Sequence, residues 1–117
     1  MHVMICDDSM LVRKKLRELL EELGYSVCEA VNGVQAVEVY REIKPSAVLM
    51  DIVMPQMDGL TALRTIKEID SNAYVVMVSS AGTSSKLLEA LKSGASDFIQ
   101  KPYSTAQIAK ALEAVKG

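Results

Sequence analysis

The chain has 117 residues, half of them hydrophobic, with 13 basic and 15 acidic residues and a formal net charge of −2. This length fits one domain with a real core, the weak acidic balance does not suggest a nucleic-acid-binding surface, and no run approaches the ~20 apolar residues of a membrane span. The apolar start before Asp7 is too short for a signal peptide, so we expect a cytoplasmic protein.

Strand and helix patterns alternate along the whole chain. Short apolar runs predict strands, and longer amphipathic runs predict helices. Gly24, Pro45 and Gly94 mark where three of the helices stop. The predicted strands are Val3–Cys6, Tyr25–Ala30, Ala47–Met50, Ala73–Val78 and Phe98–Gln100. The predicted helices are Met10–Leu23, Val34–Ile43, Gly59–Ile69, Thr83–Ser93 and one opened by Ser104, with Gln107 completing a capping box.

Strict alternation of strand and helix favours an α/β fold with one doubly wound parallel sheet and helices on both faces. In such a sheet the carboxyl ends of all strands lie along one edge, where ligands bind. Polar residues follow the first, third, fourth and fifth predicted strands, so we expect them to converge: Asp7 and Asp8, Asp51, Ser79, and Lys101.

This set of residues has a definite chemistry. Close carboxylates repel one another unless a cation neutralises them, and all-oxygen ligation suits Mg²⁺. A carboxylate can also attack phosphorus to form an acyl phosphate, while a lysine stabilises charge on the transferred oxygens. Each piece alone has an ordinary explanation, since Asp7 and Asp8 could begin a helix and Ser79 could be a small loop residue. Together they predict a site for phosphoryl chemistry.

Four blocks of the chain resemble the signature motifs of bacterial response-regulator receiver domains: Val3–Ser9, Met50–Gly59, Val78–Ala81 and Gly94–Pro102. The resemblance covers essentially all 117 residues, and stand-alone chemotaxis regulators are the most similar members. It implies a flavodoxin-like sheet with strand order 2-1-3-4-5 and a single receiver domain over residues 1–117.

The resemblance also implies a role for each site residue. Asp51 would be the phosphoacceptor. Asp8, Asp51 and the backbone carbonyl of Val53 would ligate Mg²⁺, with Asp7 helping through water. Lys101 would contact the phosphoryl group.

Two further residues would read the phosphorylated state. Ser79 would sense the phosphoryl group, and Phe98 matches the aromatic position whose packing changes. In this family a cis peptide bond precedes the residue matching Pro102. Exposed contacts to a target are expected at Lys86, Lys92 and Tyr103.

The implied function is a two-component signalling switch. A histidine kinase would be the phosphodonor, because His2 is the only histidine and precedes the first strand. The target would be a protein such as a flagellar switch component, and we expect a monomer that binds neither nucleic acid nor membrane. The chain would catalyse its own phosphotransfer and dephosphorylation without being a conventional enzyme.

Other functions remain open at this point. The chain could be a phosphorelay intermediate or the receiver fragment of a longer DNA-binding regulator. An aspartate-nucleophile phosphatase is disfavoured, because its Asp-x-Asp motif is replaced by the adjacent Asp7 and Asp8.

Three positions depart from the family pattern: Cys6, Phe98 and Val53. Phe98 has no hydroxyl, so any switching there would be by packing. Cys6 replaces the usual aliphatic residue, and with Cys28 it is expected to be a reduced thiol. Val53 replaces a polar residue found in some members, which leaves the lifetime of the phosphorylated state open.

Overall fold

The computed structural model describes residues 1–80 and 84–115. The strands in this part of the chain are β1 (His2–Cys6), β2 (Ser26–Ala30), β3 (Ala47–Asp51), β4 (Val75–Ser79) and β5 (Asp97–Gln100). The helices are α1 (Met10–Glu22), α2 (Gly33–Ile43), α3 (Gly59–Ile69), α4 (Ser84–Lys92) and α5 (Thr105–Glu113).

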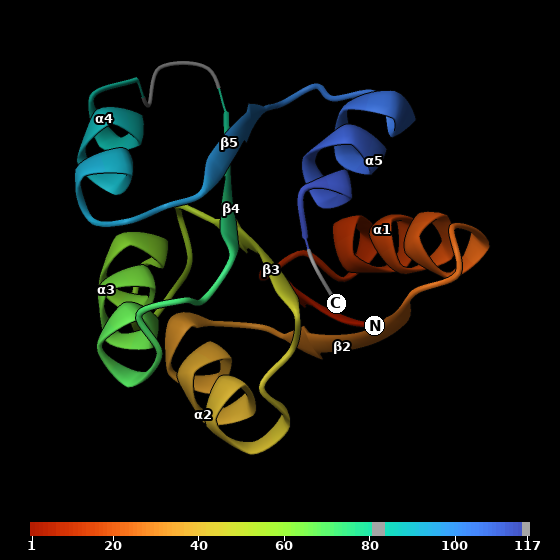
Figure 1. Ribbon diagram of the computed structural model, residues 1–117. Helices are drawn as coiled ribbons and strands as arrows, with labels where there is room; N and C mark the ends of the chain where they lie inside the picture. Colours follow the sequence, from red (N-terminus) through yellow and green to blue (C-terminus); the bar gives the residue numbers. More distant parts are fainter. Residues whose placement is uncertain (81–83, 116–117) are drawn as a thin grey trace.

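The five strands form one parallel sheet in the order β2-β1-β3-β4-β5, which confirms the expected topology. Figure 1 shows α1 and α5 on one face of this sheet and α2, α3 and α4 on the other. Every strand therefore ends at the same edge, and the loops that leave this edge form the candidate site.

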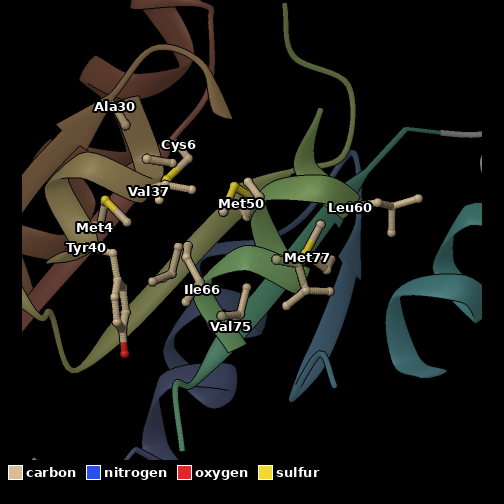
Figure 2. Packing of buried hydrophobic residues seen from close by; sticks show 14 of the residues in the cluster. Met4, Cys6, Ala30, Val37, Tyr40, Met50, Leu60, Ile66, Val75 and Met77 are labelled. Carbon is tan, nitrogen blue, oxygen red and sulfur yellow. The ribbon is translucent and has the colours of Figure 1, made fainter. Parts of the chain in front are cut away.

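Both faces of the sheet are packed with aliphatic side chains. On the face covered by α2 and α3, Met4 of β1, Met50 of β3 and Met77 of β4 are fully buried, and Met50 lies level with Met77 on the neighbouring strand (Figure 2). On the other face, Leu20 of α1 and Ile108 of α5 are fully buried over the sheet. The core contains few aromatic residues and many methionines. Methionine can fill its irregular gaps because the unbranched thioether chain is flexible.

The predicted element boundaries are mostly correct within one or two residues. β4 starts at Val75, two residues later than predicted, and β3 and β4 each end one residue later than predicted, because Asp51 pairs with Val78 and Ser79 pairs with Gln100. Periodicity along one strand does not reveal which neighbour it pairs with, so these ends were missed. The predicted helix start at Thr83 lies outside the described residues.

The connection from β3 to α3 depends on close backbone approaches. A Cβ atom on Gly59 would collide with the carbonyl oxygen of Asp51, and one on Gly33 would collide with that of Met57. Asp58 caps α3 by accepting a hydrogen bond from the Thr61 N–H at 2.8 Å. The segment that follows Asp51 is therefore held between its own strand and the start of α2.

The described helices offer no candidate for a transmembrane span, since none combines the necessary length with an apolar sequence.

Candidate phosphoryl and metal site

Asp7, Asp8 and Asp51 meet at the carboxyl edge of the sheet. Each contributes a carboxylate oxygen, and these three oxygens lie within 4.8 Å of one another. The Lys101 ammonium reaches the same place from the end of β5, with Nζ 3.3 Å from Asp51 Oδ2 and 3.5 Å from Asp7 Oδ2. The structure thus brings together an acidic group and a cation that are far apart in the sequence.

Asp7 is held on all sides. Its backbone N–H donates to the carbonyl oxygen of Ala30 at 3.1 Å, and its Oδ1 accepts a hydrogen bond from the Ser9 N–H at 2.8 Å. Asp7 is only 4% exposed, whereas the neighbouring Asp8 is exposed. The two adjacent aspartates therefore differ, one fixed inside the site and one open at its mouth.

Asp51 closes β3 with a side chain that is 12% exposed. Its Oδ1 accepts a hydrogen bond from the Val53 N–H at 3.2 Å. Burial raises the pKa of Asp51 and the Asp7 carboxylate adds to this, while Lys101 and the Val53 N–H oppose it.

Lys101 also has a raised pKa. Burial alone would lower it, but the carboxylates of Asp51 and Asp7 outweigh that effect. In an isolated ion pair the pKa of the acid would fall, so the rise for Asp51 shows that burial and a second carboxylate exceed what one lysine supplies. The site has an excess of negative charge that a cation would relieve.

The donor set fits Mg²⁺. Carboxylate oxygens are the hard ligands that this ion prefers, and Mg²⁺ commonly uses few of them and keeps several waters. The exposed position of Asp8 leaves room for such waters at the mouth of the site.

Ser79 lies at the end of β4 with a residue exposure of 1%. Its Oγ is buried, and no described residue gives it a hydrogen bond. Because an unsatisfied buried hydroxyl costs free energy, this atom is suited to a ligand that arrives later. Phe98 of β5 pairs with Met77 of β4. Ser79 lies two residues after Met77 on β4, so its side chain is on the same face of the sheet as that of Phe98. Phe98 as a whole residue is 42% exposed.

The peptide bond between Lys101 and Pro102 is cis, as the resemblance implied. Lys86 and Lys92 are exposed, as expected. The expectation for Tyr103 is wrong, because its side chain is half-buried in a pocket of about 220 Å³ beside Leu16 and Leu19 of α1. A tyrosine next to a turn looks exposed in a sequence, but α1 packs against it.

One contact of the site was missed from the sequence. Arg13 of α1 belongs to none of the sequence motifs, but its Nη1 donates to the Asp7 carbonyl oxygen at 2.8 Å. A glutamate in the middle of an otherwise apolar strand, Glu29, was the available signal, because a half-buried carboxylate needs a cationic partner.

Comparison with known protein families decides where this arrangement belongs. Residues 3–113 match the model of the response regulator receiver domain. The chain is a member of the receiver-domain family.

Receiver proteins that the chain resembles come from distant bacteria. The chemotaxis protein CheY of Thermotoga maritima is 43% identical over 114 residues, covering 97% of this chain and 95% of its own. CheY of Bacillus subtilis is 43% identical over 111 residues, covering 94% and 92%. The solved CheX-CheY-BeF3-Mg²⁺ complex from Borrelia burgdorferi contains a chain with 34% identity and a TM-score of 0.90, and the match covers 97% of this chain and 87% of that one.

Proposed function

We propose that this receiver domain, spanning residues 1–117, is a phosphoacceptor switch of a two-component system. It takes a phosphoryl group from a histidine kinase onto Asp51 and thereby changes its affinity for a protein target. The likeness to CheY proteins favours chemotaxis as the process and the cytoplasm as the compartment.

The observation that carries this proposal is the position of Asp51. Its carboxylate stands at the end of a buried strand, 3.3 Å from Lys101 Nζ and within 4.8 Å of two other carboxylates. A nucleophile beside a cation and a metal-ligating group is the arrangement that phosphoryl transfer requires.

In the transfer, an Oδ atom of Asp51 forms a bond to phosphorus while the bond from phosphorus to the donor's imidazole nitrogen breaks. The electron pair of that bond stays on the nitrogen. Lys101 lies where it can pair with the oxygens of the transferred group.

Asp8, Asp51 and the Val53 carbonyl are the proposed holders of Mg²⁺, with Asp7 acting through water. When bound, this ion neutralises charge on the phosphoryl oxygens. The division of roles agrees with the structure, because the oxygens of Asp7 already accept from Ser9 and lie near Lys101 while Asp8 is exposed.

The switch is proposed to run from Ser79 to Phe98. A phosphoryl group on Asp51 offers acceptor oxygens to the unpartnered Ser79 hydroxyl. Movement of that hydroxyl would leave room on the face it shares with Phe98, a residue that is 42% exposed and whose ring could turn inward.

A protein target is proposed to bind the surface that this movement changes, formed by α4, β5 and α5. Leu88 and Leu91 of α4 are 57% and 41% exposed, which supplies apolar area on α4 for a partner. A flagellar switch component is the proposed target, on the likeness to CheY proteins. The solved relative whose complex contains CheX offers a second kind of partner to test.

The experiment is labelling with acetyl phosphate and Mg²⁺. The wild type should gain one base-labile acyl phosphate, located on Asp51 by mass spectrometry after borohydride trapping. Asp51→Asn keeps the shape of the site, removes the nucleophile and should abolish labelling. Equal labelling of this variant would refute the assignment.

A further inference from the structure

Arg13 connects α1 to the loop that carries Asp7 and Asp8. Its Nη1 donates to the Asp7 carbonyl oxygen at 2.8 Å, and its Nε donates to Glu29 Oε1 on β2, also at 2.8 Å. The side chain is only 13% exposed. A guanidinium bonded along two edges has its plane and its reach fixed, which a lysine could not reproduce.

The carbonyl group that Arg13 holds controls the position of Asp8. The Asp7 carbonyl and the Asp8 nitrogen belong to one planar peptide unit. The other polar groups of Asp7 are also engaged, its N–H with Ala30 and its Oδ1 with Ser9. Arg13 completes this set, so the backbone from which the Asp8 side chain extends has little freedom.

Glu29 orients Arg13 from the far side. Its Oε2 accepts a hydrogen bond from Arg17 Nε at 2.7 Å, while Oε1 accepts from Arg13. Burial would raise the pKa of Glu29, but the hydrogen bonds from Arg17 and Arg13 outweigh it and lower the pKa. Glu29 is therefore a charged anchor at neutral pH.

We propose that Arg13, oriented by Glu29, is a positioning residue for the magnesium site and holds the Asp7–Asp8 peptide where Asp8 can share an ion with Asp51. This inference rests on the proposed function. The direction in which Mg²⁺ affinity changes when Arg13 is replaced is diagnostic, because Arg13 is itself a cation. Removing a positive charge near the site would strengthen Mg²⁺ binding by charge alone, whereas removing a positioning contact would weaken it.

Arg17 provides a matched control for the test. Arg13→Gln and Arg17→Gln each remove one positive charge from α1 and one hydrogen bond to Glu29. They differ in their other contacts, because Arg17 reaches the Val27 carbonyl at 3.4 Å and pairs with Glu21 at 3.5 Å, whereas only Arg13 reaches the Asp7 carbonyl. The Mg²⁺ dissociation constant of both variants is measured by titration calorimetry, and their unfolding is followed in EDTA.

Arg13→Gln should raise the dissociation constant about tenfold, the usual scale for a residue that orients a ligand, while Arg17→Gln stays close to wild type. Arg13→Lys retains the positive charge but lacks the planar guanidinium that bonds Asp7 and Glu29 together, and it should also bind Mg²⁺ more weakly than wild type. The inference is overturned if Arg13→Gln binds Mg²⁺ as well as or better than wild type, or if both glutamine variants weaken binding equally.

Glu29→Gln is the alternative test variant if Arg13→Gln does not fold. It leaves Arg13 in place without its charged anchor and should also weaken Mg²⁺ binding. Unchanged Mg²⁺ binding by Glu29→Gln would count against the inference. The wild type and Asp8→Ala separate this test from the function itself. If wild type shows no Mg²⁺ binding that Asp8→Ala reduces, the proposed function and this inference both fail. If that binding exists but Arg13→Gln leaves it intact, only the role of Arg13 fails.

Discussion

At the scale of single residues, Asp51 combines two properties that oppose each other in the absence of an ion. In its proposed role it must be exposed enough to reach a phosphodonor, yet its side chain is 12% exposed and lies close to Asp7. Its carboxylate is consequently less stable in the folded protein than in water. A cation bound beside Asp51 would lower this cost.

The raised pKa of Asp51 predicts a pH dependence of stability. Because the folded state binds this proton more tightly than the unfolded state, the contribution to stability is fully present below the unfolded-state pKa and is lost as pH rises through the folded-state pKa. In EDTA, Asp51→Asn should therefore become progressively more stable than wild type as pH rises from about 4 to about 8. Urea unfolding across this range measures the difference.

The control for this prediction is Glu68→Gln, which removes an exposed carboxyl of α3 outside the site. Its stability should follow wild type at each pH. A constant difference between Asp51→Asn and wild type across the range would contradict the prediction.

At the scale of elements, the pairing of β4 with β5 places Ser79 of the candidate site and the partly exposed Phe98 on neighbouring strands. Ser79 pairs with Gln100, and Met77 pairs with Phe98, so the hydroxyl and the ring stand on one face of neighbouring strands. The connection needs no movement of the sheet itself. In the proposed switch, a change in side-chain packing on this face couples Ser79 to Phe98.

Ser79→Ala should separate stability from switching. In the unphosphorylated protein it removes a buried hydroxyl without a described partner, so the free energy of unfolding should rise by about 1 kcal/mol. It should still accept phosphate on Asp51. The phosphorylation-induced shift between the two packing states of Phe98 should be about tenfold smaller, because one charge-assisted hydrogen bond is lost.

The readout is the ring of Phe98, which is the only phenylalanine in the chain. Its aromatic NMR signals should move on phosphorylation in the wild type and much less in Ser79→Ala. Equal movement in both proteins would show that the signal leaves the site by another route.

At the scale of the whole molecule, the sheet and its five helices hold an acidic site together against its own repulsion. Gly33 and Gly59 allow the loop after β3 to press against α2 and β3, and Lys101 closes the site from β5. Any ligand that binds only this folded arrangement must stabilise the entire domain.

Mg²⁺ should accordingly raise the melting temperature. At a free Mg²⁺ concentration of about 100 times the dissociation constant, binding stabilises the folded state by about 2.7 kcal/mol. For a domain of this size, that corresponds to a rise in melting temperature on the order of 10 °C. Asp8→Ala should lose most of this shift, and Asp7→Ala less of it, by differential scanning calorimetry with Mg²⁺ and with EDTA.

The two variants should also differ without metal. Asp8→Ala relieves repulsion at an exposed position and should be at least as stable as wild type in EDTA. Asp7→Ala loses the bond to Ser9 and the ion pair with Lys101, and it should be less stable. Equal Mg²⁺-induced shifts in wild type and Asp8→Ala would remove Asp8 from the proposed ligand set.

The order of strands and helices and the identity of the residues at the strand ends could be predicted from the sequence. Apolar periodicity and turn residues are local signals, and in a parallel sheet they suffice to bring Asp7, Asp51 and Lys101 to one edge. The order of the strands in the sheet came from the family motifs, because a local pattern does not say which strands pair.

Only the tertiary structure decided the environment of each residue. It made Asp7 buried and Asp8 exposed, left the Ser79 hydroxyl without a described partner and turned Arg13 from the solvent toward Asp7. Desolvation, pairing across strands and contacts of long side chains depend on residues distant in the sequence. A local pattern therefore identifies which groups reach the site, while packing determines their charge, their partners and their freedom.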